Sequence, residues 1–148
     1  MILPKAKTIW KNKEYERFIE MWKRGYSPLN FDADDVFSAI RIGIKLLIRF
    51  RNVEYRVSSS GRGLHFRVLD ENGNVLYLPS ERVFRIREEI GDDPGRLFWD
   101  RIKLKVRNWR PISVLFDTKN GKRAGEWKRL TLEDLIEFAK NKFLCSWQ

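Results

Sequence analysis

The N-terminal part of the chain places its apolar residues at the spacing of α-helices. Positions three or four residues apart predict a helix over residues 12–24, which Gly25 ends. A short extended piece follows over residues 26–31, and a second helix is predicted over residues 34–50. We expect the core-facing stripe of this second helix to consist of Val36, Phe37, Ile40, Ile44, Leu47 and Ile48.

From Val53 onward the hydrophobic period changes to two residues, which is the period of β-strands. This pattern predicts strands over residues 53–57, 64–68 and 75–78. Ser80 is the expected cap of a helix that ends at Gly91, and Asp93-Pro94 is typical of the start of another, which runs to about Arg107.

The last third of the chain predicts a strand over residues 112–117 and then a hairpin. Asn120-Gly121 is the strongest turn signal in the sequence, and we expect the chain to return through Glu126-Trp127. Thr131 is the expected cap of a final helix, with Asp134 at the capping-box position. The order of elements predicts a single α+β domain over residues 1–148, with a mostly antiparallel sheet of about five strands packed with helices.

Composition narrows the functional classes. The 148 residues contain one Cys and one His, which excludes a disulfide within the chain and a structural zinc site of Cys/His type. The N-terminus lacks the apolar run of a signal peptide, and no apolar stretch approaches the roughly 20 residues that span a bilayer. We therefore expect a cytoplasmic protein without a membrane partner.

The net charge is the first indication of a partner. Thirty Lys and Arg stand against twenty Asp and Glu, which gives a charge of +10. Such an excess attracts polyanions by counterion release and favours nucleic acids or nucleotides, although a generic basic surface is the alternative. Many charges of both signs with few Cys, Met and Gln are also typical of a thermophile.

Basic residues are dense between residues 85 and 110, which makes this region the candidate surface for a nucleic-acid backbone. Trp99 or Trp109 is available there for base stacking. A solvated helix face is the alternative interpretation. The candidate nucleic-acid-binding residues, which include one from an earlier strand, are Arg67, Arg96, Arg101, Lys103, Lys105 and Arg107.

Residues 58–65 have the composition of a phosphate-binding loop. Glycines and small residues let backbone N–H groups approach an anion, hydroxyls add donors, and the guanidinium of Arg62 fits a phosphate. Alternation places His65 beside Arg67, on the strand face that points away from the core. A glycine-containing hairpin turn is the alternative. The candidate phosphate-binding residues are Ser60, Gly61, Arg62, Gly63 and His65.

Acidic residues at two further positions are candidate metal ligands. Asp32 and Asp34 lie at the start of the second predicted helix, where two carboxylates can hold a hard divalent cation or cap the helix. Asp117 ends an apolar strand and is a candidate third ligand, although turn chemistry before Asn120-Gly121 explains it equally well.

Together these motifs resemble the catalytic pattern of the archaeo-eukaryotic primase superfamily, the primase–polymerases. Asp32 and Asp34 match its first motif, which is two acids around one residue. The Ser-Gly-x-Gly-x-His run that begins at Ser60 and ends at His65 matches the second, and Asp117 after an apolar residue matches the third.

The resemblance implies a replication-type nucleotidyltransferase core with an RNA-recognition-like sheet. Asp32, Asp34 and Asp117 would be the catalytic residues and would hold Mg²⁺ or Mn²⁺. Ser60 and His65 would hold the triphosphate of an incoming nucleotide, and DNA or RNA would be the second partner. An archaeal virus or plasmid is the source that we hypothesise. The alternatives are a non-catalytic DNA- or RNA-binding module, a metal-dependent nuclease and a structural or virion-associated protein.

Overall fold

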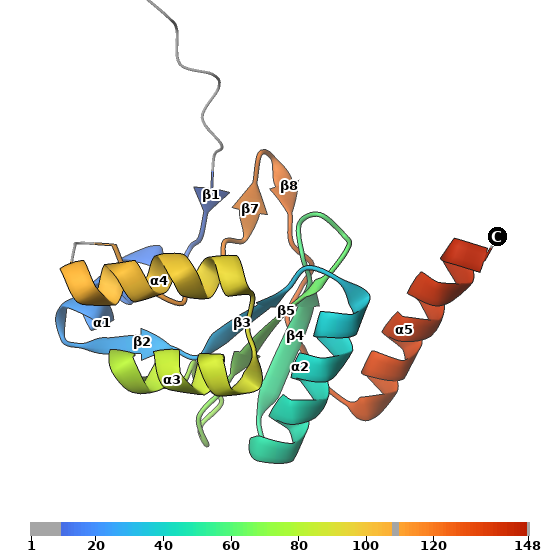
Figure 1. Ribbon diagram of the computed structural model, residues 1–148, viewed down its shortest axis with the longest axis horizontal. Helices are drawn as coiled ribbons and strands as arrows, with labels where there is room; N and C mark the ends of the chain where they lie inside the picture. The colour runs from blue at the N-terminus through green and yellow to red at the C-terminus, as the bar shows by residue number, and fades with distance from the viewer. Residues whose placement is uncertain (1–9, 108–109, 148) are drawn as a thin grey trace, which may run out of the picture.

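The computed structural model describes residues 10–107 and 110–147, whose arrangement is shown in Figure 1. The helices are α1 (Tyr15–Lys23), α2 (Val36–Arg49), α3 (Ser80–Ile90), α4 (Pro94–Val106) and α5 (Leu132–Trp147). The strands are β1 (Trp10–Lys11), β2 (Tyr26–Pro28), β3 (Asn30–Ala33), β4 (Val53–Val57), β5 (Leu64–Val68), β6 (Tyr77–Pro79), β7 (Thr118–Lys119), β8 (Lys122–Arg123) and β9 (Lys128–Arg129). The expected α+β class is confirmed.

The main sheet has four strands in the order β3-β5-β4-β9, and all of its pairs are antiparallel. Two smaller sheets, β2-β6 and β1-β7-β8, take the remaining strands, so the strands do not form the one sheet that the sequence suggested. On β5, Leu64, Phe66 and Val68 are buried in the core, and His65 and Arg67 alternate onto the opposite face. That opposite face is polar across the sheet and carries the site.

The core lies between the apolar face of the main sheet and helices α2, α3 and α5. The stripe expected on α2 is wrong, because Phe37 and Ile48 are 70% and 81% exposed. Helix α2 contacts the main sheet on one side and α5 on a neighbouring side. Small residues permit the close contact with α5, since a Cβ at Gly43 would lie 2.7 Å from Leu135 Cδ2. The buried residues of α2 are Ala39, Ile42, Gly43 and Leu46.

Helix ends follow the local signals in the sequence. Helix α3 forms and Gly91 ends it at a φ of 93°, as expected. The expected cap is wrong, because Ser80 is the first residue of the helix and its hydroxyl pairs with Ser27 Oγ. Asp93 caps α4 by accepting a hydrogen bond from Arg96 N at 2.9 Å. Thr131 and Asp134 form the expected capping box at the start of α5. None of the described helices combines the length and the apolar character that crossing a bilayer requires.

The strand expected over residues 112–117 is absent. The segment is irregular, with Ser113 at a φ of 64°. The backbone N–H of Ser113 donates to Asp100 and its carbonyl accepts from Asn30 Nδ2, so distant side chains satisfy the backbone in place of a neighbouring strand.

The hairpin turn at Asn120-Gly121 is confirmed, since both residues have the positive φ that a tight hairpin turn favours. Its return strand is wrong, however. The chain returns as β8 and not through residues 126–127, and Lys128–Arg129 pairs with β4 as β9.

Candidate functional site

Segments that are distant in the sequence meet on the polar face of the main sheet. The register places Asp32 of β3 and Arg56 of β4 on either side of His65 of β5. Asp32 Oδ1 lies 3.7 Å from His65 Nε2, and Arg56 Nε donates to His65 Nδ1 at 3.0 Å. Arg56 Nη1 also donates to Asp117 Oδ1 at 2.5 Å. The candidate residues Asp32, His65 and Asp117 therefore form one row.

Arg56 joins this row but is not among the residues that the sequence singles out. The alternation of apolar and polar residues in this strand does place Arg56 on its polar side. Its pairing with His65 depends on strand register, however, and the sequence does not fix the register of this pair.

His65 is neutral and held in one tautomer. Burial, followed by the positive charges of Arg56 and Arg96, lowers the pKa of His65 to about 3. Because Nδ1 accepts from Arg56, the ring proton lies on Nε2 and faces Asp32. The expected strand face is confirmed, but the side chain is buried instead of open to solvent. Trp127, which stacks on Arg56 and Arg67, helps to cover this face of the sheet.

The ionised form of Asp32 is destabilised by burial. Burial raises its pKa to about 6, and the charges of Asp34, Asp92 and Asp93 add to this effect, while Arg96 opposes it. Its Oδ1 is buried and has no hydrogen-bond partner among the described residues. An ionised carboxylate in this setting is stabilised by a cation.

The capping alternative applies to neither Asp32 nor Asp34. The cap of α2 is Asp35, whose side chain accepts from Ser38 N at 2.9 Å. Asp34 is exposed, and burial together with Asp93 and Asp35 raises its pKa. Both acids are therefore free to bind a ligand.

An acidic cavity of about 100 Å³ opens beside these residues. This volume is enough for a few water molecules or a partly hydrated cation. The carboxylates that line it belong to Asp32, Asp34, Asp35, Asp92 and Asp93.

The expected set of three metal ligands does not come together. Asp117 is bound to Arg56 near Nδ1 of His65, whereas Asp32 faces Nε2 of the same ring. Within residues 10–107 and 110–147, no three His, Cys, Asp or Glu side chains are placed to hold a metal ion by themselves. The pair Asp32 and Asp34 still fits Mg²⁺ or Mn²⁺, because such an ion takes one or two carboxylates and completes its shell with water and substrate phosphates.

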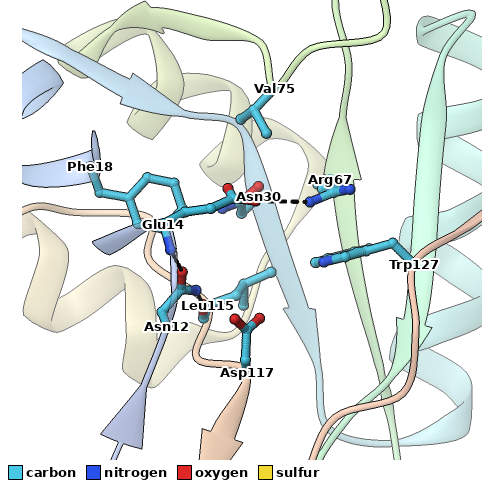
Figure 2. A pocket seen from close by; sticks show the side chains of 9 residues that line it. All are labelled: Asn12, Glu14, Phe18, Asn30, Arg67, Val75, Leu115, Asp117 and Trp127. Carbon is cyan, nitrogen blue, oxygen red and sulfur yellow. Dashed lines mark hydrogen bonds and ion pairs between the residues drawn. The ribbon is translucent and has the colours of Figure 1, made fainter. Parts of the chain in front are cut away.

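A second cavity of about 10 Å³ lies at the Asp117 end of the row, between Trp127 and α1. Figure 2 shows Arg67 above the ring of Trp127 and Asp117 below it. The space has room for one water molecule at most.

The loop between β4 and β5 adjoins the acid pair, as the sequence suggested. A Cβ at Gly63 would lie 1.8 Å from the carbonyl oxygen of Ala33, so only glycine allows this approach. Arg62 is exposed and lowers the pKa of Asp34, which places it near the cavity.

The serines of this loop mostly bond within it. Ser58 Oγ accepts from Gly63 N and lies 3.1 Å from Ser60 Oγ, while Ser60 Oγ accepts from Arg62 N. Gly61 N donates to Ser58 O at 2.9 Å. The hairpin-turn alternative therefore describes the resting loop, and Arg62 is its group most available to a phosphate.

The candidate residue Arg96 is part of a buried ionic network and not of a surface. Its Nη1 donates to Asp92 at 2.6 Å, and its Nη2 donates to Val114 O. Arg87 has no exposed area and donates to Asp92 and Asp100 at 2.7 and 2.6 Å. This network joins α3, α4 and the segment before Asp117 beneath the acidic cavity.

Most other candidate nucleic-acid-binding cations are also neutralised. Arg67 pairs with Glu54 at 2.6 Å, and Lys103 lies 3.5 Å from Asp100. The pairs Arg101–Glu88 and Arg107–Glu81, both at 2.5 Å, join α4 to the acids of α3. Lys105 is exposed and has no ion pair among the described residues.

The face of α4 therefore carries cations that are mostly paired with acids of the protein. It exposes Trp99, which is 63% accessible, while Trp109 lies outside the described residues. Comparisons with protein-family models, with curated proteins and with solved structures found no match.

Proposed function

We propose that the protein binds a nucleoside triphosphate with a divalent cation and acts on nucleic acid as a primase–polymerase-like nucleotidyltransferase core. The observation that carries this proposal is the row on one sheet face, in which Asp32 contacts His65 and Arg56 links His65 to Asp117. The acids and the histidine belong to separate motifs in the order of the primase–polymerase pattern.

Asp32 and Asp34 are the residues that would hold Mg²⁺ or Mn²⁺. The buried Oδ1 of Asp32 lacks a hydrogen-bond partner among the described residues, and Asp34 lines the same cavity. When bound, such an ion supplies positive charge that stabilises the attacking and leaving oxygens of phosphoryl transfer. Asp117 is held by Arg56, and its role is to fix the orientation of that guanidinium.

His65 would donate a hydrogen bond to a phosphate oxygen without bringing a charge. Arg56 fixes the Nε2 proton, and the low pKa of His65 prevents protonation near pH 7. A group that remains neutral over this range is suited to positioning and not to proton transfer. Arg62 at the cavity edge would add a charged donor to the same triphosphate.

The Arg56–Asp117 bond favours a second candidate function, a non-catalytic nucleic-acid-binding module. This bond holds Asp117, the third acid of the pattern, apart from the Asp32–Asp34 pair. In such a protein the acidic cavity would have no nucleotide to bind.

Replacing the acid pair tests the proposal. In the double variant Asp32→Asn/Asp34→Asn, we expect Mn²⁺-dependent dATP binding to weaken by roughly tenfold to a hundredfold, the range for disturbed metal sites. Isothermal titration with and without Mn²⁺ measures this change. The matched control is Glu133→Gln/Glu137→Gln, which removes two charges from exposed positions on α5 that do not line the cavity.

Both variants should bind nucleic acid as the wild type does. If the double variant binds dATP unchanged, the acid pair holds no cation and the binding module becomes the better description. The same conclusion follows if the wild type binds no dATP in the presence of Mn²⁺.

A further inference from the structure

The β7–β8 hairpin stands beside the β4–β5 loop at one end of the molecule (Figure 1). Backbone bonds fix its base: Ala124 N donates to Asp117 O at 2.8 Å, and Gly125 N donates to Val57 O at 2.9 Å. Lys119 of the hairpin and Arg62 of the loop both lower the pKa of Asp34. Gly63 of the loop packs against the backbone of Ala33 and Asp34. The hairpin and the loop therefore form a rim beside Asp34, one of the residues that line the acidic cavity.

This rim concentrates positive charge. No acid occurs between Asp117 and Glu126 in the sequence. Lys119 lies directly opposite Lys122 in the register, an arrangement of like charges that destabilises a strand pair. We call this set the cationic rim; its members are Arg62, Lys119, Lys122 and Arg123.

The cations of the rim differ from those of α4 in their partners. Arg62, Lys122 and Arg123 are exposed, and none of them pairs with an acid in the described part of the chain. On α4, by contrast, Arg101 and Arg107 are paired with acids of α3. Within the described residues, the exposed cations of the rim that lack an acidic partner are therefore Arg62, Lys122 and Arg123.

Protection of sheet edges does not account for the whole rim. Lysine on an edge strand prevents pairing with other chains, and β8 is such an edge. Arg62, however, lies in a turn, and Lys119 is on β7, which is paired on both sides. Charges spread over a loop and both hairpin strands fit successive phosphates of an extended polyanion better than one isolated anion.

We propose that the cationic rim binds the phosphate backbone of a nucleic-acid strand, DNA or RNA, and directs that strand to the cavity at Asp32 and Asp34. The inference rests on the proposed function for the reaction at the cavity. Binding by the rim requires only exposed cations and a polyanion, and is measurable separately.

The test is the double variant Lys122→Gln/Arg123→Gln, compared with wild type by fluorescence anisotropy of a labelled 20-nucleotide oligothymidylate over a KCl titration. Two lost phosphate contacts should reduce the slope of log affinity against log salt by about 1.4 and weaken binding near 0.1 M salt by roughly ten- to thirtyfold. The matched control is Arg82→Gln/Arg85→Gln. It removes equal charge from exposed positions on α3, away from the hairpin (Figure 1).

A loss of affinity and slope in the hairpin variant alone, with dATP binding unchanged, supports the inference. An equal loss in both variants, no loss in either, or no oligonucleotide binding by the wild type overturns it. None of these outcomes bears on nucleotide binding at Asp32 and Asp34. Loss of that site in Asp32→Asn/Asp34→Asn, with the oligonucleotide still bound, concerns the proposed function alone.

Discussion

Replacing Arg87 by Met is expected to lower the free energy of unfolding by about 3–5 kcal/mol. The guanidinium has no exposed area and donates to Asp92 and Asp100. Met fills much of the same volume but leaves two buried carboxylates with fewer counter-charges. Burial alone would raise the pKa of Asp100, yet Arg87 and Arg96 hold that pKa below its ordinary value, so the carboxylate stabilises the fold while it is ionised.

Urea denaturation at neutral pH measures this loss. The control is Arg85→Met, which changes an exposed arginine of the same helix and should alter stability by no more than about 0.5 kcal/mol. A loss below about 1 kcal/mol for Arg87→Met would mean that the buried network contributes little to the fold.

Asp32→Asn should have the opposite effect and stabilise the protein at neutral pH. The pKa of Asp32 rises from 3.8 to about 6, a difference equivalent to about 3 kcal/mol. Because 24% of the side chain is exposed, solvent screening reduces the expected gain to about 1–3 kcal/mol. An amide of the same shape carries no charge that burial can penalise.

The sign follows from proton linkage. Since the folded pKa of Asp32 lies above the unfolded value, the native state holds the extra proton between about pH 4 and 6. The stability of the wild type relative to Asp32→Asn therefore falls as pH rises through this window and remains lower above it. Below about pH 4 the carboxyl is neutral in both states, and the gain should vanish.

Unfolding midpoints from pH 4 to 8 in EDTA test this expectation. Asp35→Asn serves as the control and should show no gain. The hydrogen bonds that the Asp35 carboxylate accepts from Ser38 and Phe37 lower its pKa. An Asp32→Asn variant with the same advantage at pH 4 and pH 8 would contradict a buried, ionised Asp32. A native residue that lowers the stability of the fold, as Asp32 does here, is typical of a functional site.

Local signals in the sequence were sufficient for much of the fold. The bounds of α3, the Asp93-Pro94 start of α4 and the turn at Asn120-Gly121 each depend on a few neighbouring residues, and each is found in the structure. The failures depend on contacts between distant elements. Residues 112–117 look like a strand, but bonds to Asn30 and Asp100 hold them in another shape.

The same distinction applies to the site. Motif order suggested that Asp32, His65 and Asp117 would meet, and strand register brings Asp32 to His65 and links Asp117 through Arg56. The sequence could not show that Arg56 would engage Asp117, or that acids of α3 would neutralise the cations of α4. Such ion pairs depend on how helices and strands pack, which residue types alone do not specify.

The central claim is that a nucleotide binds beside His65, and this residue offers a direct test because it is the sole histidine of the chain. A long-range proton–nitrogen NMR spectrum therefore contains one imidazole. We expect a neutral ring with its proton on Nε2 near pH 7, and a change at Nε2 when dATP and Mg²⁺ are added together. Imidazole resonances that stay unmoved at saturating dATP and Mg²⁺ would contradict the nucleotide site.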